Sequence, residues 1–374
     1  MSPRARGLYE ALKGSNLLVG VYVNDLIITG DSVQEIEVFK AQMKKKFSMS
    51  DLGLLSYYLG IEVKQSSGEI SLCQSAYAVK LLDKCSMADC NAVQVPMDQR
   101  HKLSKNSSNP PVDTTTYRSI VGSLRYLVHT RPDLAYSVGI VSRFMENPTT
   151  EHMSVVKKIL RYVKGTINFG CMYKKGKEGL ILHGYSDSDM AGDVDDRKST
   201  SGMIFYLGPN PISWNSQKQK VVALSSCEAE YIAASTAACQ GVWLRRLLAD
   251  LTKKEVRKVS LKIDNQAAIS LCKNPVHHER SKHIDTRFHY IRECVEEGMI
   301  EVQHVNTNDQ LADILTKSLG RQKFIEMRKK VRVQELKKCN QLKEVNVDVN
   351  LIVSSPSRTR TRSPIRVRIP NSST

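Results

Sequence analysis

The chain has 374 residues, of which 41% are hydrophobic and 6% aromatic, so it is long enough for two packed domains or three. Its net charge of +17 and its pI of about 9.4 indicate a polyanionic partner, most simply a nucleic acid. The first residues lack the apolar stretch of a signal peptide, and the longest apolar run, Leu17 to Thr29, is interrupted and too short to span a bilayer, so we expect neither export nor a membrane partner.

The first predicted elements are two strands within residues 17–30, where Val and Ile are enriched. They flank the polar pair Asn24–Asp25, which is either a hairpin turn or the remains of a metal site. We predict that a helix follows and that Asp31 or Ser32 caps it. The apolar stripe of this helix consists of Ile36, Phe39, Met43 and Phe47.

A short strand over 59–63 and a hairpin at Gly68 come next. Residues 102–116 are polar and contain prolines, which predicts an exposed linker. Three helices are then expected, over 117–129, 132–145 and 151–164. Basic side chains of the last helix form either a solvated face or a rib that faces phosphates: Lys157, Lys158 and Arg161.

From residue 178 the pattern changes to that of a mixed sheet. Strands are predicted at 179–186, 202–207, 211–215, 220–224, 259–264 and 300–305. Helices are predicted at 226–249, 265–273, 284–296 and 308–318. Antiparallel strands followed by alternating helices and strands indicate an α/β (α+β) fold, with helices packed on the sheet.

The C-terminal part of the chain is its most basic region. Residues 321–374 hold 14 Lys and Arg against 4 Asp and Glu, which places +10 of the net +17 there. From about residue 335 the chain is of low complexity and contains prolines, so we expect it to be disordered.

Acidic residues at predicted strand ends and helix starts are the candidate catalytic groups. Asp187 and Asp189 end one strand and share its parity, so periodicity does not choose between them. Ser225 and Glu228 form a capping box. Glu230 lies about 200° around the helix from Glu228, on an alanine-lined face where a carboxylate is costly unless something pairs with it.

Two further acids complete the candidate set. Asp264 ends a predicted strand, and Asp313 lies in the early turns of a predicted helix. Each has a structural alternative, Asp264 as an N-cap and Asp313 as an acid that the helix dipole favours. Carboxylates brought together repel one another unless a cation binds them. Oxygen ligands suit two Mg²⁺ or Mn²⁺ ions, which can activate a water and stabilise the leaving oxygen of a phosphodiester.

From about residue 17 to 330 the chain resembles the C-terminal part of a copia-type LTR-retrotransposon polyprotein. The motifs that carry the resemblance follow one another in the family's order: YVNDLIITG, YYLGIEV, YRSIVGSLRYL, RPDLAYSVGIVSRFM, LRYVKGT, GYSDSDMAGD, DDRKSTSG, ALSSCEAEYIAAS, DNQAAISL, HIDTRFHYIRE and QLADILTK. The resemblance implies the end of a reverse transcriptase followed by a ribonuclease H domain.

The resemblance assigns the metal ligands of this ribonuclease H to four carboxylates: Asp187, Glu230, Asp264 and Asp313. It thereby favours Asp187 over Asp189. Such an enzyme cuts the RNA strand of an RNA–DNA hybrid, which it recognises by the 2′-hydroxyls. Three polar neighbours are candidate nucleic-acid contacts: Ser186, Asn265 and Gln266. A loop histidine near this place assists proton transfer in ribonuclease H enzymes, which makes His304 a candidate for that role.

The opening hairpin resembles the reverse transcriptase site in which two adjacent aspartates hold catalytic metals. Here Asn24 replaces the first aspartate and Asp25 matches the second, and an amide is a weaker ligand for a hard cation. The remaining carboxylate of the family's site would lie upstream of residue 1. We therefore expect a degenerate polymerase site and no DNA synthesis.

The expected domains are a truncated palm with the start of a thumb (1–101), a linker (102–116), a helical thumb or connection (117–175), an RNase H-like domain (176–320) and a basic, mostly disordered tail (321–374). Two functions stay open, a metal-dependent ribonuclease H and a catalytically inactive nucleic-acid-binding remnant. A complete reverse transcriptase or other Pol products are candidate partners.

Cysteines and histidines suggest no further metal site. The nine cysteines are odd in number and lack zinc-finger spacing, which indicates reduced thiols in a cytoplasmic or nuclear protein. Four histidines are clustered in the chain, but no cysteine or acidic set completes a zinc site, so surface or packing roles are expected for them: His277, His278, His283 and His289.

Overall fold

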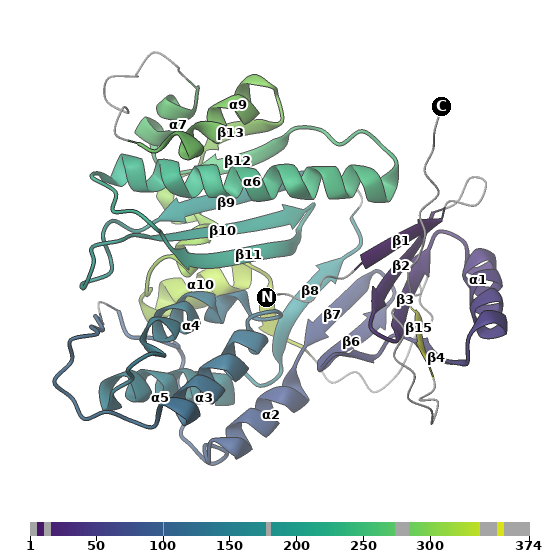
Figure 1. Cartoon of the computed structure of the whole chain (residues 1–374), viewed down its shortest axis with the longest axis horizontal. Coiled ribbons are helices and arrows are strands. Elements are labelled where there is room, and N and C mark those ends of the chain that lie inside the picture. The colour runs from purple at the N-terminus through teal and green to yellow at the C-terminus, as the bar shows by residue number, and fades with distance from the viewer. Residues whose placement is uncertain are drawn as a thin grey trace. The chain divides into compact units, whose positions relative to one another are not determined.

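The computed structural model divides into two units, one formed by residues 1–55 with 347–374 and the other by residues 56–346 (Figure 1). The residues that it describes are 6–10, 16–99, 101–176, 181–273, 284–336 and 350–354. Three five-stranded sheets lie within these ranges. No helix in the described ranges is long and apolar enough to cross a membrane.

The first unit contains a sheet with strand order β1-β2-β3-β15-β4. Its strands are β1 (Arg6–Glu10), β2 (Leu17–Tyr22), β3 (Asp25–Gly30), β4 (Met49–Leu54) and β15 (Asn350–Ser354). β2 and β3 form the predicted antiparallel hairpin, which the pair Tyr22–Asp25 closes. The turn is therefore Val23–Asn24 rather than Asn24–Asp25, and Val23 takes the positive φ of 53° that the turn needs.

Helix α1 (Val33–Lys46) follows this hairpin, and Ser32 caps it by accepting a hydrogen bond from the Glu35 amide. Ile36 is buried with the hairpin side chains in the core of this unit. The predicted apolar stripe ends before Phe47, because that residue leaves the helix in an extended conformation and is 45% exposed.

The second unit begins with the sheet β14-β8-β7-β6-β5. Its strands are β5 (Tyr57–Tyr58), β6 (Ile61–Ser66), β7 (Glu69–Cys73), β8 (Phe169–Lys174) and β14 (Val333–Glu335). The predicted hairpin turns at Gly68, whose φ is +77°. β6 starts later than predicted, because Leu59 and Gly60 form a turn with φ values of 50° and 78°.

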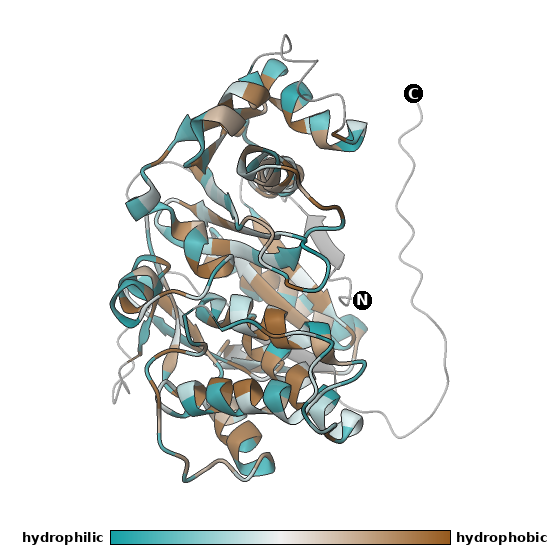
Figure 2. Ribbon diagram, turned by 90° about the vertical axis from the view of Figure 1, so that its left-hand side faces the viewer, coloured by the Kyte–Doolittle hydropathy of each residue, from teal (hydrophilic) through white to brown (hydrophobic). Residues whose placement is uncertain are grey.

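Helices pack beside this sheet around the largest hydrophobic core. They are α2 (Ser75–Lys84), α3 (Thr114–Leu127), α4 (Ala135–Val141), α5 (Thr150–Lys164) and α10 (Arg321–Lys330). Figure 2 shows that hydrophobic and hydrophilic residues alternate along the helices of the protein, and most hydrophobic residues of these five helices are buried in or packed against this core. The predicted helix over 132–145 is shorter, because 3₁₀ turns at Pro132–Leu134 and Ser142–Phe144 flank α4.

The segment 321–374, expected to be a basic and mostly disordered tail, begins with ordered elements. Residues 321–330 form α10, and β14 pairs with β8. Phe324 and Met327 are buried in the same core as α3 and α5. The basic composition misled the prediction, because the lysines and arginines of α10 hide a short apolar face. The residues 337–349 and 355–374 lie outside the described ranges.

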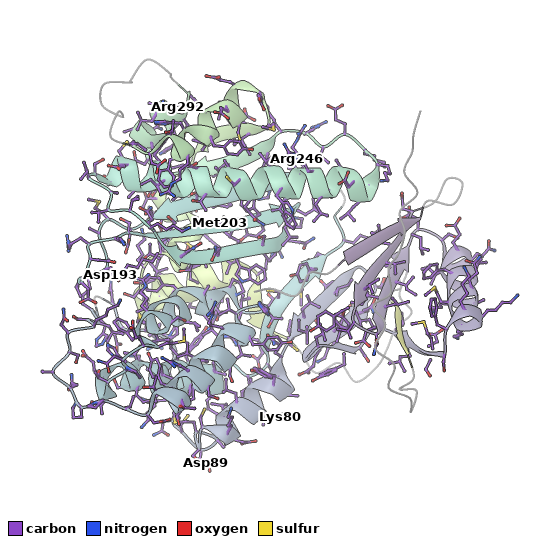
Figure 3. All side chains as sticks on the ribbon, in the orientation of Figure 1. Lys80, Asp89, Asp193, Met203, Arg246 and Arg292 are labelled. Atoms are coloured by element: carbon purple, nitrogen blue, oxygen red, sulfur yellow. The ribbon has the colours of Figure 1, made fainter. Side chains whose placement is uncertain are left out.

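The third sheet has the order β11-β10-β9-β12-β13. Its strands are β9 (Leu182–Ser188), β10 (Thr200–Leu207), β11 (Asn210–Lys218), β12 (Val259–Ile263) and β13 (Ile300–His304). β9, β10 and β11 are antiparallel, whereas β12 runs parallel to both β9 and β13. Helix α6 (Ser226–Thr252) crosses one face of this sheet, where Met203 of β10 is labelled in Figure 3.

Two shorter helices pack with α6, namely α7 (Gln266–Lys273) and α9 (Tyr290–Glu296), which a 3₁₀ turn at Thr286–His289 precedes. The predicted strand over 220–224 is wrong, because β11 ends at Lys218 and the chain continues irregularly to α6. The predicted helix over 308–318 is also wrong. Side-chain caps at Asn306 and Gln310 divide this segment into the 3₁₀ turns η4 (Thr307–Asp309) and η5 (Leu311–Leu315).

Candidate metal centre

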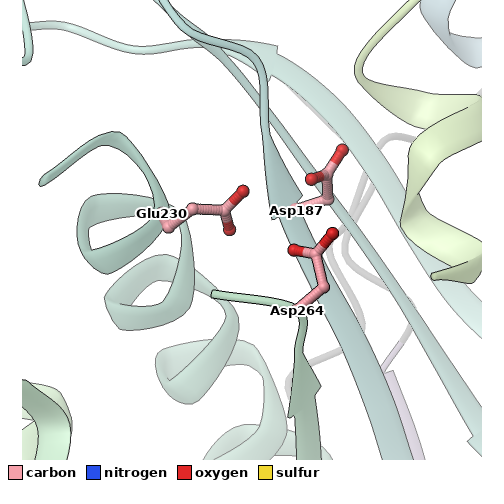
Figure 4. A group of neighbouring side chains, drawn as sticks. All are labelled: Asp187, Glu230 and Asp264. Atoms are coloured by element: carbon pink, nitrogen blue, oxygen red, sulfur yellow. The ribbon is translucent and has the colours of Figure 1, made fainter. Parts of the chain in front are cut away.

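Three carboxylates meet at one edge of the third sheet. Asp187 lies near the end of β9, Glu230 on α6 and Asp264 directly after β12, and one oxygen of each lies within 4.8 Å of the others (Figure 4). In the described part of the chain this is the one group of three or more potential metal ligands. No comparable group therefore surrounds Asp25 in the ranges that the structure covers.

Strand register explains why Asp187 and Asp264 meet. The parallel pairing of β9 with β12 places Lys262 beside Tyr185. Continuing this register by two residues brings Asp264 to the level of Asp187. Because parallel strands end at the same edge of a sheet, both carboxylates are delivered there by the backbone alone.

Capping bonds separate Glu230 from Glu228, as predicted. The Glu228 amide donates to Ser225 Oγ at 3.1 Å, and Glu228 Oε2 accepts from the Leu224 amide at 2.8 Å. Glu230 instead faces the sheet together with Ala233, which is 2% exposed. The small side chains of this face leave room for a carboxylate beside β9.

Asn265, rather than Asp264, is the N-cap of helix α7. Asn265 Oδ1 accepts a hydrogen bond from the Ala268 amide at 3.0 Å, so Asn265 caps α7. The Asp264 carboxylate is thereby left to face the other two acids. Capping already occupies the side-chain oxygen of Asn265, whereas Gln266 is exposed; their role as nucleic-acid contacts stays a prediction.

Asp187 and Asp189, which sequence periodicity could not separate, have different partners. Asp189 Oδ1 accepts from the Thr200 amide at 2.5 Å and so anchors the start of β10. Asp187 is 2% exposed and accepts a short hydrogen bond from the Thr316 hydroxyl. It pairs in register with Gly202, where a Cβ would lie 2.7 Å from the Thr316 methyl carbon. Gly202 thus lets the end of η5 approach Asp187.

Asp313 joins the site from η5, outside the three-carboxylate group but next to Asp187. Lys317 Nζ lies 2.8 Å from Asp313 Oδ1 and 3.7 Å from Asp187 Oδ2. Burial and the neighbouring Asp187 raise the pKa of Asp313 to about 7, and Lys317 opposes this rise. Burial acts against the charge of Lys317, but Asp187 and Asp313 more than offset it, so the pKa of Lys317 is raised.

Among the acids of the site, Glu230 has the pKa that is raised most. Its burial, followed by the proximity of Asp187 and Asp264, raises its pKa to about 10. Glu230 Oε1 accepts from the Ser188 amide at 3.1 Å, whereas the buried Oε2 meets no hydrogen-bond donor among the described residues. A buried oxygen without a donor, inside a cluster of three acids, fits a divalent cation that prefers oxygen ligands.

Three other residues predicted to contact nucleic acid are buried or already have partners within the protein. Ser186 is fully buried, so its side chain is not exposed to a nucleic acid in this structure, and its role as a contact stays a prediction. Lys158 pairs with Asp98, and Arg161 Nε donates to the Asn91 carbonyl at 2.7 Å. Both therefore have partners within the protein.

The remaining predicted contacts stay untested. Lys157 is exposed. His304 is the last residue of β13 and is also exposed, so it can reach solvent at the end of the sheet that carries Asp264. Of the histidine cluster, His289 lies 2.9 Å from the Tyr231 hydroxyl, and its other members lie outside the described ranges: His277, His278 and His283.

Sequence reasoning missed three residues of the site, Thr316, Lys317 and Gln219. Gln219 Nε2 bonds Ser188 Oγ at 3.1 Å and the Ala229 carbonyl at 2.9 Å, and so ties β9 to α6. The four-residue spacing from Asp313 to Lys317 was a signal for an ion pair. Nothing local indicated that the pair would include Asp187, which lies 130 positions earlier in the chain.

A pocket of about 290 Å³ lies next to the site, between β10, β11 and α6. Its basic side chains are Lys218, Lys220 and Arg287. Lys218 is held by Asp193, which Figure 3 labels, through a contact of 2.6 Å. Arg287 pairs with Asp285 at 3.2 Å, so Lys220 is the one basic side chain of this pocket that has no ion pair among the described residues.

Comparison with known proteins yields the following relationships. A family model described as reverse transcriptase (RNA-dependent DNA polymerase) matches residues 1–99. The Pol polyprotein from transposon RE1 of Arabidopsis thaliana is 45% identical over 313 residues, 84% of this chain, and the chain spans 21% of that polyprotein's length. The uncharacterised mitochondrial protein AtMg00810 of the same plant is 39% identical over 223 residues, which are 60% of this chain and 92% of that protein.

Among solved structures, RNase H1 of the archaeon Halobacterium salinarum aligns with 36% of this chain and 93% of its own, with 16% identity and a TM-score of 0.25. The observed sheet, with three antiparallel strands, two parallel ones and flanking helices, is a mixed sheet with helices packed on it, as the sequence predicts.

Proposed function

Because the chain belongs to the family of copia-type retrotransposon Pol polyproteins, we propose that its second unit is a metal-dependent ribonuclease H that cuts the RNA strand of RNA–DNA hybrids. The observation that carries this proposal is the convergence of Asp187, Glu230 and Asp264 within 4.8 Å around a buried oxygen without a donor. Carboxylates that are so close repel one another when charged, and a cation between them removes this repulsion.

The protein's own groups have distinct tasks in this proposal. Asp187, Glu230, Asp264 and Asp313 would hold two Mg²⁺ or Mn²⁺ ions. When bound, such ions supply an activated water and stabilise the leaving oxygen of the phosphodiester. Thr316 and Ser188 fix the carboxylates of Asp187 and Glu230 through hydrogen bonds, so the acids are oriented before substrate arrives.

The basic pocket beside the acidic cluster supports a nucleic-acid substrate. Lys220 lines it and can neutralise a phosphate of a strand that passes the cluster. His304, exposed at the end of β13, is a further candidate for proton transfer to the solvent side.

The experiment is cleavage of an RNA–DNA hybrid, labelled on its RNA strand, by the purified full chain with Mg²⁺. Asp187→Asn should abolish cleavage, whereas Asp309→Asn should retain it, because Asp309 is 66% exposed and pairs with Lys330 outside the cluster. Folded wild-type protein that leaves the hybrid intact at millimolar Mg²⁺ and Mn²⁺ would contradict the proposal.

The second candidate function is a catalytically inactive remnant that binds nucleic acid. The observation that favours it is Asn24 in the exposed turn of the hairpin, where the family's polymerase site has an acid. We accordingly propose that the chain performs no DNA synthesis. Hybrid binding that Asp187→Asn leaves unchanged, together with no cleavage by either protein, would favour this second function.

A further inference from the structure

Lys317 places a positive charge at a position where the proposed site would bind one of its two metal ions. Its ammonium lies 2.8 Å from Asp313 Oδ1 and 3.7 Å from Asp187 Oδ2, so it bridges the two acids. Both carboxylates are buried, whereas the side chain of Lys317 is 41% exposed. The ammonium therefore closes this part of the site from the solvent side.

The four acids thereby divide into two unequal cation positions that share Asp187. The first lies among Asp187, Glu230 and Asp264, and neither Glu230 nor Asp264 has an ion pair among the described residues. The second lies between Asp187 and Asp313 and already contains the ammonium. Lys317 contacts both acids of the second position but only the shared Asp187 of the first, so it neutralises the second position more strongly.

We propose that Lys317 is a resident cation that competes with a divalent ion for the position between Asp187 and Asp313. This inference rests on the proposed function, since it concerns the same acids. In the free protein one ion binds tightly at the first position. A second ion enters only when the ammonium leaves, because two like charges at this separation repel each other strongly.

The exposure of Lys317 makes such a departure possible. Its flexible stem can turn the ammonium outward without disturbing η5, and a substrate phosphate is the anion that would attract it. Filling of the second position is then coupled to the arrival of nucleic acid, which restricts the complete metal centre to the substrate complex.

Calorimetric titration of the full chain with Mn²⁺, without nucleic acid, tests this inference. Wild type should bind one ion tightly and a second one at least tenfold more weakly. Lys317→Met, or Lys317→Gln as a second neutral variant, should tighten the second site roughly tenfold or more. Lys317→Arg keeps the charge and should behave as wild type. Circular dichroism checks that each variant is folded.

A matched control is Lys330→Met. Lys330 also pairs with two carboxylates, at 3.0 Å and 2.9 Å, and its side chain is 37% exposed, but neither partner belongs to the site. Lys330→Met should therefore leave the affinities of both Mn²⁺ sites unchanged. Equal affinities in wild type and in both neutral Lys317 variants would overturn the role of Lys317 while the nuclease proposal stands. Wild type that binds no Mn²⁺ at all would overturn the metal centre itself.

Discussion

At the scale of single residues, Glu230 is the acid whose charged form the site disfavours most. In the metal-free protein burial and two neighbouring acids raise its pKa to about 10, well above that of an unfolded glutamate near 4.5. The folded state therefore holds a proton that the unfolded state releases above pH 4.5. Between these two pKa values, stability falls as the pH rises, by up to roughly 1.4 kcal/mol per pH unit.

Glu230→Gln should remove this pH dependence. We expect the variant to be more stable than wild type at pH 7 in EDTA, by about 2 kcal/mol, and the difference should shrink at pH 4.5. Millimolar Mg²⁺ should raise the melting temperature of wild type but not of the variant. Urea denaturation at the two pH values measures the first effect. A variant less stable than wild type in EDTA at pH 7 would refute the argument.

At the scale of secondary-structure elements, the approach of η5 to β10 depends on Gly202. A Cβ at this position would lie 2.7 Å from the Thr316 methyl carbon and 2.8 Å from Leu315 Cβ. Gly202→Ala should therefore move η5 away from Asp187, destabilise the fold by about 1–3 kcal/mol and reduce hybrid cleavage. Thermal unfolding and the cleavage assay measure the two losses.

Gly122→Ala is the matched control. This glycine lies in α3 with no atom within 4 Å of the added Cβ, so alanine should stabilise the helix by about 0.5–1 kcal/mol. If both substitutions have the same effect on stability, close packing between η5 and β10 is not the reason why position 202 requires glycine.

The same scale shows what the sequence could predict. The hairpin of β2 and β3, the long α6 and the strands β9, β10, β12 and β13 follow from local periodicity, and so does the difference between Glu228 and Glu230. The segment 308–318 does not form the predicted helix, because its helical apolar spacing is overridden by caps at Asn306 and Gln310. The position of Lys317 depends on contacts across 130 residues, which no local pattern encodes.

At the scale of the whole molecule, a buried polar network ties α10 to the helices before the third sheet. Arg131 pairs with Asp133 at 2.8 Å, and both are almost fully buried. The Tyr162 hydroxyl donates to Asp133 at 2.6 Å and accepts from Arg328 of α10 at 2.9 Å. Removing a partner from such a network leaves a buried charge uncompensated.

Truncation therefore distinguishes α10 from a dispensable tail. A chain that ends at Gly320 loses Arg328 and the buried Phe324 and Met327, so we expect its second unit to unfold at a markedly lower temperature. A chain that ends at Leu336 retains these residues, and its second unit should melt as in the full chain. Differential scanning calorimetry compares them. Equal melting of the two truncated chains would show that α10 contributes little.

The sheet of the first unit has a consequence for synthesis on the ribosome. β15 comes from residues 350–354, yet it lies between β3 and β4, which come from the first 54 residues. β3 and β4 cannot acquire this neighbour until residues 350–354 have been translated. Residues 56–346 are contiguous and can fold first. The sheet of the first unit is thus completed only after residues 56–346 have been made, and the edges of β3 and β4 stay unpaired until β15 follows.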